Sequence, residues 1–405
     1  MIIILGDYDK INSKLIVVIL SKKKYICSEI FVNKKKIDSI DTIKKNTTTK
    51  IILDIKSFNK ENITIEIYNK SKIICSIENL NLIKIFENII VMGCDSTLGL
   101  EKNLWNKLKH TKSHYLIHCG DQIYNDKIFK KYYRFINIDD EKNIKKLEKE
   151  IFNNYYNQFY RYKNILKYNL NLMIPDDHEI VDDAYENKHK DNDKFTKIKN
   201  IFQKFVTNIE LALKINSDDL YYIEDEKNEI IYVLNYTTDF TDQLLNKYDF
   251  DNKIIPYNNI TLLSRKSLLS SKNSLFNQLI FSQESITLVN IDNLLKKIIK
   301  YDKKMYIFCG DDHSYKKSII LYKNKNICEI ITCGSINTVP ELFKNKIILN
   351  TQINGITLEN ISYELINNFI KIKNQNNMIK IINVSEGKNM LFYLLDNIIN
   401  VYNLL

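Results

Sequence analysis

Short runs of apolar and β-branched residues, separated by clusters of Lys, Asn, Ser and Thr, fill the chain from Lys14 to about Leu82. Runs of this length bounded by polar clusters predict β-strands joined by turns. Their spacing favours a small antiparallel β-sandwich. The predicted strands are Leu15–Leu20, Tyr25–Val32, Ile51–Ile55, Ile63–Tyr68 and Ile73–Ile77.

The pattern changes after residue 85, where polar or acidic residues follow each short apolar run and helical stretches lie between the runs. Alternating strands and helices predict an α/β domain with its functional groups at the carboxyl ends of the strands. We therefore predict two domains, a small β-sandwich over residues 1–85 and an α/β domain over residues 86–405. The predicted helices are Leu100–Leu108, Glu141–Tyr162, Phe195–Leu213 and Ile291–Tyr301. The predicted strands are Ile89–Met92, Tyr115–Ile117, Leu170–Ile174, Tyr306–Phe308, Glu329–Ile331, Phe369–Ile372, Met378–Val384 and Met390–Leu395, with a turn at Ser385–Lys388 before the last of them.

Composition indicates an ordered protein. The chain has 405 residues, of which 44% are hydrophobic and 27% charged, a balance that allows a buried core and excludes a disordered chain. No run reaches the roughly 18 uncharged apolar residues that a membrane-spanning helix needs. The first seven residues lack the basic start and the cleavage site of a secretory leader. We expect a cytoplasmic protein without a membrane span.

The net charge of +10 comes almost wholly from dispersed lysines, since arginine occurs only at positions 134, 161 and 265. Bidentate recognition of bases or phosphates favours arginine, so a nucleic-acid partner is an alternative that we do not favour. The seven cysteines are odd in number and contain no Cys-x-x-Cys pair, which indicates mostly core residues in a reducing compartment. Cys119 and Cys309, each before a Gly-Asp pair, are expected to pack in the core.

Four short segments combine glycine or proline with acidic residues directly after an apolar run. The chain has only eight glycines, so a glycine at a strand end indicates a need for positive φ or for close approach to a ligand. Neighbouring carboxylates repel one another, and a multivalent cation removes that conflict. The segments are Gly93-Cys94-Asp95-Ser96, Gly120-Asp121-Gln122-Ile123-Tyr124-Asn125-Asp126, Pro175-Asp176-Asp177-His178-Glu179 and Gly310-Asp311-Asp312-His313-Ser314.

The donors of these segments are sufficient for two metal ions, and two ions about 3.5 to 4 Å apart suit displacement at phosphorus. A positioned proton-transfer group contributes about 10²- to 10⁴-fold, whereas hydrolysis of a phosphate monoester can need up to about 10²¹-fold. His178 alone could not supply that acceleration, but a metal-bound hydroxide is available at neutral pH. We therefore predict a metal-dependent phosphomonoesterase or phosphodiesterase whose partner is a small-molecule phosphoester.

The order Gly-Cys-Asp, Gly-Asp-x-x-Tyr, Asp-Asp-His-Glu and Gly-Asp-x-His-Ser resembles the PhoD-like (alkaline phosphatase D) family of calcineurin-like metallophosphoesterases. The resemblance covers roughly residues 88 to 340 in motif order. It implies a four-layer sandwich, in which two mixed sheets are flanked by helices, preceded by the small N-terminal β-sandwich.

The resemblance implies an iron site and a second, divalent site, which holds calcium in secreted relatives. Asp121 would be shared between the two ions, with Asp177 and Asp311 on the second. Thiolate and phenolate ligands suit ferric iron better than magnesium. As a ligand, Cys94 is preferred to its neighbour Asp95. The implied metal ligands are Cys94, Asp121, Tyr124, Asp177, Asp311 and His313.

The implied catalytic residues are Asp177, His178 and Glu179. His178 would face the phosphate, either as proton donor to the leaving oxygen or as a hydrogen-bond clamp. Glu179 and Asp176 would orient it. His118, just before the Gly-Asp turn, is a further candidate for an orienting group.

One element that is usual in the family is missing. Relatives carry an Asp-x-Arg element on the strand between the third and fourth motifs, but Tyr232–Phe240 contains no arginine. A phosphate clamp is then absent or replaced by lysines and backbone donors. This keeps open a second function, in which the fold has lost catalysis and serves as a metal-binding, phosphate-binding or interaction module. Every implied ligand position carries a competent donor, so we favour the enzyme.

Overall fold

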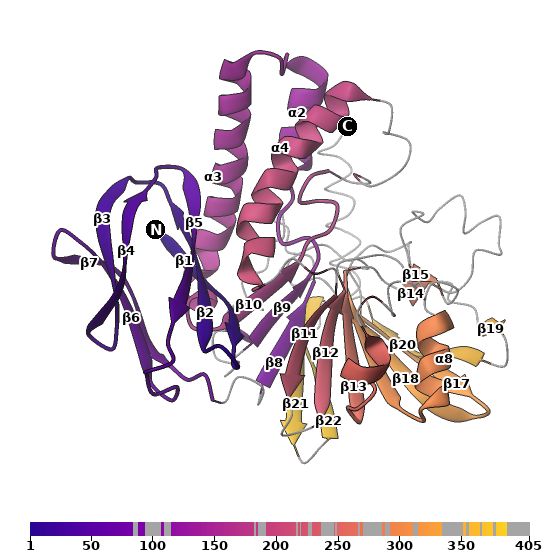
Figure 1. Ribbon diagram of the computed structural model, residues 1–405. Coiled ribbons are helices and arrows are strands. Elements are labelled where there is room, and N and C mark those ends of the chain that lie inside the picture. Colours follow the sequence, from indigo (N-terminus) through magenta and orange to yellow (C-terminus); the bar gives the residue numbers. More distant parts are fainter. Residues whose placement is uncertain are drawn as a thin grey trace. The chain divides into compact units, whose positions relative to one another are not determined.

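The computed structural model describes residues 1–83, 88–93, 107–108, 115–181, 184, 192–215, 218, 220–225, 229–235, 247, 249–265, 268–269, 286–287, 292–310, 315–333, 351–353, 356–364, 367–375 and 378–386. The chain divides into two compact units, whose elements are drawn in Figure 1. The first unit holds residues 1–89, 107–118 and 123–217, and the second holds residues 90–106, 119–122 and 218–405. Within the ranges given above, no helix has both the length and the apolar character needed to cross a membrane.

Eight strands form a first mixed sheet. Their order is β22 (Met378–Glu386), β21 (Asn367–Gln375), β8 (Asn88–Met92), β9 (Tyr115–Cys119), β10 (Leu170–Ile174), β1 (Ile2–Asp9), β2 (Lys14–Ser21) and β5 (Thr47–Asp54). β1 pairs with β10 in parallel and with β2 in the antiparallel sense. β1 and β2 are buried at nearly every position, because interior strands of such a sheet are covered on both faces.

Eight further strands form a second mixed sheet, in the order β11 (Leu220–Asp225), β12 (Ile230–Asn235), β13 (Asn259–Ser264), β16 (Lys304–Cys309), β18 (Lys325–Thr332), β17 (Tyr315–Tyr322), β20 (Ile356–Glu364) and β19 (Thr351–Ile353). β12, β13, β16 and β18 run parallel. One register row holds Asn235, Ser264, Cys309 and Thr332, so these four strands end at one edge of the sheet. A buried apolar cluster joins this sheet to α6 (Phe250–Lys253) and α8 (Asp292–Lys300). β14 (Leu268–Leu269) and β15 (Ile286–Thr287) form a separate short pair.

A third, antiparallel sheet has the order β4 (Lys35–Ile43), β3 (Tyr25–Val32), β6 (Ile63–Asn69) and β7 (Lys72–Leu80). Alternate residues of β6 are buried, as expected for a sheet with one face in a core. Residues 1–85 thus contribute strands to two sheets, because β1, β2 and β5 join β10 in the first one. The domain boundary after residue 85 and the N-terminal β-sandwich stay predictions.

Three helices of the first unit pack against one another, as Figure 1 shows: α2 (Asp126–Phe135), α3 (Glu141–Leu166) and α4 (Asp193–Ile209), which continues into the short η2 (Leu211–Leu213). The Phe129 ring of α2 lies 4.9 Å from that of Phe195 and 5.5 Å from that of Phe202, measured between centroids. Asp140 and Asn192 cap α3 and α4, since each side chain accepts a 2.9 Å hydrogen bond from a backbone N–H of the first turn.

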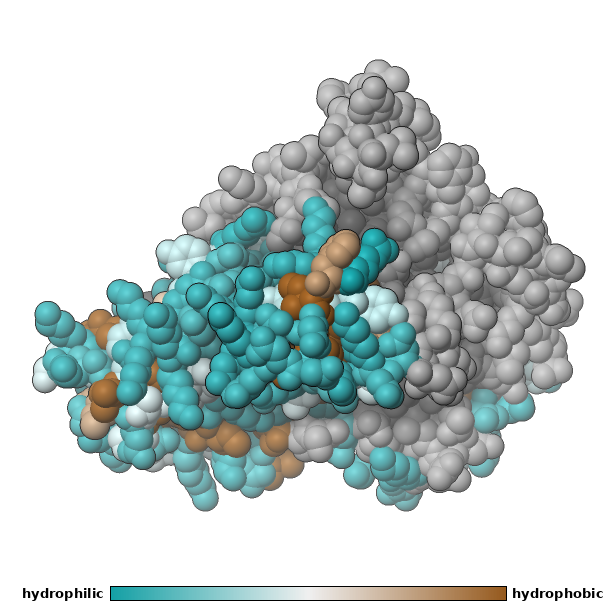
Figure 2. All heavy atoms as spheres, turned by 90° about the horizontal axis from the view of Figure 1, so that it is seen from above, coloured by the Kyte–Doolittle hydropathy of each residue, from teal (hydrophilic) through white to brown (hydrophobic). Residues whose placement is uncertain are grey.

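The prediction of an α/β fold with two mixed sheets is confirmed. β3 and β10 have the predicted bounds, and β22 runs to Glu386, through the first half of the turn predicted there. β1, β4, β17, β20 and α2 are among the elements that were not predicted. Hydrophilic side chains cover most of the described part of the face in Figure 2, as dispersed lysines predict. Predicted elements outside the described residues are Leu100–Leu108, except for its last two residues, and Met390–Leu395.

Candidate metal centre and its neighbouring histidine

The second sequence motif begins with a tight turn at the end of β9. Gly120 has a φ of 88° and Asp121 a φ of 56°, so two successive residues adopt left-handed conformations. Glycine adopts them at no steric cost, whereas a residue with a Cβ is strained. Aspartate is among the residues that tolerate this region best. The turn buries the Asp121 side chain, and only 1% of this residue is exposed.

The third motif forms a hydrogen-bonded turn after β10. The Asp176 N–H donates to Glu179 Oε2 (2.6 Å), and the Asp177 N–H donates to Asp176 Oδ1 (2.9 Å). The Asp177 carbonyl accepts from the N–H groups of Ile180 and Val181 (2.8 Å each). All three acidic side chains of this turn are buried. Hydrogen bonds within the turn therefore fix its backbone where three carboxylate side chains are buried in the protein interior.

Asp121, Asp176 and Asp177 come together at the ends of the neighbouring strands β9 and β10. Each offers a carboxylate oxygen, and these three oxygens lie within 4.8 Å of one another. Buried like charges at such separations are unfavourable unless a proton or a cation compensates them. Carboxylate oxygens are also ligands that divalent cations prefer. The donor set thus fits a metal ion.

His178, next to Asp177, is held by a carboxylate from α2. Its Nδ1 lies 2.9 Å from Asp126 Oδ2, and its ring stacks on Tyr124 with centroids 4.4 Å apart and an interplanar angle of 30°. The His178 side chain is 22% exposed and that of Asp126 is 16% exposed. The imidazole is therefore oriented on two sides yet partly exposed to solvent.

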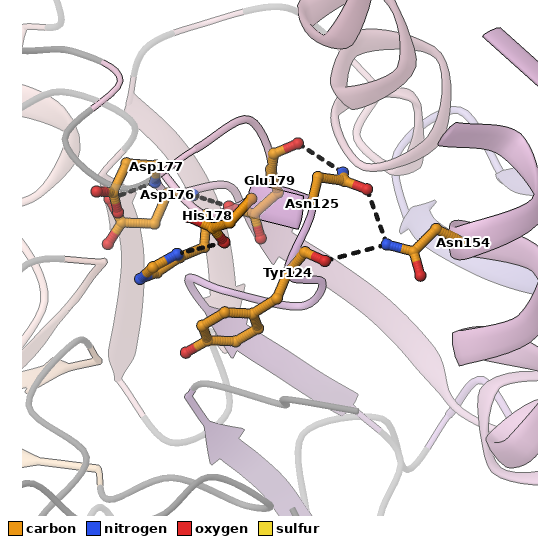
Figure 3. Close-up of polar contacts among 8 residues, drawn as sticks. Tyr124, Asn125, Asn154, Asp176, Asp177, His178 and Glu179 are labelled. Carbon is orange, nitrogen blue, oxygen red and sulfur yellow. Dashed lines mark hydrogen bonds and ion pairs between the residues drawn. The ribbon is translucent and has the colours of Figure 1, made fainter. Parts of the chain in front are cut away.

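Asparagines connect the second and third motifs, as Figure 3 shows. The Asn125 N–H donates to the His178 carbonyl (2.9 Å), and its Nδ2 donates to the Glu179 carbonyl (2.7 Å). Asn154 Nδ2, from α3, donates to Asn125 Oδ1 (2.8 Å) and to the Tyr124 carbonyl (3.1 Å). Because Asn125 also precedes the first residue of α2, the start of this helix and the His178 turn are fixed to each other.

Glycines of the first and fourth motifs meet the end of β9. A Cβ built on Gly310 would lie 1.8 Å from the Cys119 carbonyl oxygen, and one built on Gly93 would lie 3.3 Å from Gly310 Cα. Three strand ends therefore approach so closely that a side chain on Gly310 has no room. Cys119 and Cys309 are fully buried, which confirms the prediction that they pack in the core. Burial raises the pKa of the Cys119 thiol.

The structure brings together part of the predicted site. Asp121 and Asp177 share one cluster, and Tyr124 and His178 stack. Asp176, predicted only to orient His178, contributes a carboxylate to the cluster itself. Predicted residues outside the described ranges are Cys94 with its alternative Asp95, Asp311 and His313.

Two residues of this region had no predicted role. Asp126 contacts the imidazole of His178, a role that the family resemblance implied for Glu179 and Asp176. Asn125 joins the two turns. Their sequence signal is an Asn-Asp pair at the start of a helix, where such residues favour the first turn, but α2 was not predicted.

The sequence matches no family model and no curated protein. Among solved structures, the chain is similar to a structure of PhoD, with a TM-score of 0.62 and 11% sequence identity, over 94% of this chain and 88% of that chain. Vacuolar protein sorting 29 from Cryptosporidium parvum aligns with 9% identity over 75% of this chain and 98% of its own, with a TM-score of 0.24, which is too low to indicate a common fold. The predicted resemblance is confirmed at the level of the fold: this chain has a PhoD-like fold.

Proposed function

We propose that this chain is a metal-dependent phosphoester hydrolase, a phosphomonoesterase or phosphodiesterase that uses two metal ions. The observation that carries the proposal is the cluster of buried carboxylates at Asp121, Asp176 and Asp177. Such a cluster is costly without a cation. His178 adds a proton-transfer group next to Asp177, and the PhoD-like fold supports the same class of activity.

We assign the metal ions to ligands from all four sequence motifs. Asp121, Asp176 and Asp177 offer oxygen ligands. Thiolate, phenolate and imidazole donors suit iron, and carboxylates suit a divalent ion such as calcium. When bound, the ions would generate a nucleophile from water at neutral pH and neutralise charge on the phosphoryl oxygens. The remaining proposed ligands, which rest on the sequence resemblance, are Cys94, Tyr124, Asp311 and His313.

His178 is the group that we assign to proton transfer. With Nδ1 directed at Asp126, the Nε2 proton is the one to be donated to the leaving oxygen. The Asp126 carboxylate fixes the ring tautomer and stabilises the protonated ring before transfer. The stacked Tyr124 ring restricts rotation of the imidazole. Glu179 acts indirectly. Its carboxylate accepts a hydrogen bond from the Asp176 N–H and so shapes the turn that contains Asp177 and His178.

The proposal includes the finer features that the sequence predicts. These are the four-layer arrangement of two sheets flanked by helices, the N-terminal β-sandwich and a cytoplasmic location. A small phosphoester is the preferred substrate. A nucleic-acid substrate would make several phosphate contacts, so its binding would fall steeply as salt rises.

Chelation and substitution test this proposal. The chelator-treated chain and Asp121→Ala should lose metal and lose turnover of nitrophenyl phosphate or its bis-ester, while the far-UV circular dichroism spectrum stays that of the untreated protein. Asp38→Ala, at an exposed position of β4, is the matched control and should retain both. Turnover that survives chelation and Asp121→Ala would refute the hydrolase. Binding of metal and phosphate without turnover would instead support the second function, a binding module.

A further inference from the structure

Arg265 lies at the carboxyl edge of the second sheet. It directly follows β13, whose last residue, Ser264, shares a register row with Cys309 at the end of β16. The hydrogen-bond ladder between β13 and β16 continues beyond the end of β16, since the Gly310 N–H donates to the Ser264 carbonyl (3.2 Å). Arg265 is therefore next to Gly310, the residue that precedes Asp311 in the fourth motif.

The backbone of Arg265 is part of the crowded meeting point of the motifs. A Cβ on Gly310 would lie 3.3 Å from the Arg265 carbonyl oxygen and 1.8 Å from that of Cys119. Asp121 follows Cys119 by two residues, after the left-handed turn. Arg265 thus joins the edge of the second sheet at which the second and fourth motifs converge.

Burial distinguishes Arg265 from the other two arginines. Arg134 and Arg161 are exposed, whereas Arg265 is 9% exposed. A guanidinium remains charged at any physiological pH, so burying it is costly unless anionic groups surround it. It presents five N–H donors, and a bidentate carboxylate accepts two of them. A buried guanidinium can therefore hold one carboxylate of the protein and still bind a second anion.

We propose that Arg265 binds the nonbridging phosphoryl oxygens of the substrate, an inference that rests on the proposed hydrolase function. A planar guanidinium fork matches two such oxygens, which both monoesters and diesters carry. β12 ends at Asn235 in the register row of Ser264, and Tyr232–Phe240 supplies no arginine. Of the three arginines in the chain, Arg265 is the one that follows a strand of this edge. A lysine would present a single point charge here, whereas an arginine offers bidentate geometry.

A purely structural role of Arg265 would give different experimental results. If Arg265 only neutralised a carboxylate of the fold, replacing it would lower the melting temperature but leave the affinity of the folded protein for phosphate unchanged. Affinity for phosphate therefore separates the two roles, whereas stability alone does not.

The test compares Arg265→Met and Arg265→Lys with Arg161→Met, an exposed arginine of α3, in the full-length chain purified with its metals. The measurements are kcat and KM for nitrophenyl phosphate, the inhibition constant of inorganic phosphate, the thermal shift produced by inorganic phosphate, and the metal content. Arg265→Met should lower kcat/KM by about 100-fold and raise the inhibition constant about tenfold or more, with metal content unchanged. Arg265→Lys should fall between the wild type and Arg265→Met, and Arg161→Met should match the wild type.

The outcomes separate this inference from the proposed function. Wild-type kcat/KM and phosphate inhibition in Arg265→Met overturn it, and so does loss of the folded state in both Arg265 variants, since the arginine is then structural. If the wild type shows no metal-dependent turnover, the hydrolase proposal fails. A phosphate-induced thermal shift that is lost in Arg265→Met would still support anion binding by Arg265.

Discussion

His118 is a buried histidine whose protonation is coupled to the stability of the folded protein. It lies in β9, three residues before Asp121, and is 6% exposed. Burial lowers the pKa of His118 from 6.5 to about 4, a shift that the side chain of Asn171 in β10 partly offsets. The folded protein therefore keeps this imidazole neutral at a pH at which the unfolded chain protonates it.

The sign and the size of the effect follow from these two pKa values. Between pH 6.5 and 4 the unfolded chain binds one proton more than the native state at this position, so stability falls as the pH is lowered. Each pKa unit corresponds to about 1.4 kcal/mol, so the displacement from 6.5 to about 4 costs about 3 kcal/mol in total. The loss begins near pH 6.5 and is complete below about pH 4.

Urea unfolding of the wild type and of His118→Gln, followed by circular dichroism between pH 7 and 4, measures this term. The carboxylate titrations are common to both proteins and cancel in the difference. The wild type should lose about 3 kcal/mol more than the variant over this range. In the native protein, the His118 ring proton resonance should not titrate above about pH 5. Equal losses in both proteins, or a native-state titration near pH 6.5, would refute the reasoning.

Two further predictions concern the site. Asp126→Asn retains an acceptor for His178 Nδ1 but removes the charge that stabilises the protonated ring, so kcat should fall by about 10- to 100-fold, with KM and metal content unchanged. Asp139→Asn, at an exposed position, is the control. An unchanged pH–rate profile of Asp126→Asn would contradict the assigned role. Gly310→Ala places a Cβ 1.8 Å from the Cys119 carbonyl oxygen and should destabilise the protein by about 3 kcal/mol or more, as measured by thermal unfolding, whereas Gly93→Ala, with its Cβ 3.3 Å from the nearest atom, should cost clearly less. Equal melting temperatures for the two alanine variants would mean that the crowding at Gly310 is relieved by small backbone shifts.

Strands with an apolar run bounded by polar clusters are the part of the fold that the sequence predicts best. β3 and β10 have the predicted bounds because their runs of apolar and β-branched residues are bounded by polar clusters. β4 was not predicted because most of its side chains are exposed and polar. Its sequence therefore shows little of the alternation of apolar and polar residues that identifies a strand. β1 was not predicted because Gly6-Asp7 interrupts its apolar run, and because its partner β10 lies more than 150 residues away in the sequence. Pairing at that separation is not encoded in any local pattern.

The candidate site shows the same limit. Carboxylates after successive strand ends predicted the cluster at Asp121 and Asp177, because parallel and neighbouring strands bring their ends to one edge. The partner of His178 could not be derived in this way. It depends on where α2 begins, and the motif that contains Asn125 and Asp126 carries no apolar period of its own. The family resemblance implied Glu179 and Asp176 as orienting groups, whereas in the structure Asp126, 52 positions away in the sequence, contacts the imidazole.

Two of the few glycines in the chain are needed at strand ends, for two different physical reasons. Gly120 is needed for its φ of 88°, which starts the turn that buries Asp121. Gly310 is needed for its missing side chain, because the Cys119 carbonyl occupies the place of a Cβ. A sequence cannot distinguish these requirements, since both appear as a glycine after an apolar run. Gly120 sets the path of Asp121, and Gly310 lets the end of β16 approach the carbonyl groups of Cys119 and Arg265. The glycines therefore shape the backbone on which the proposed site is built.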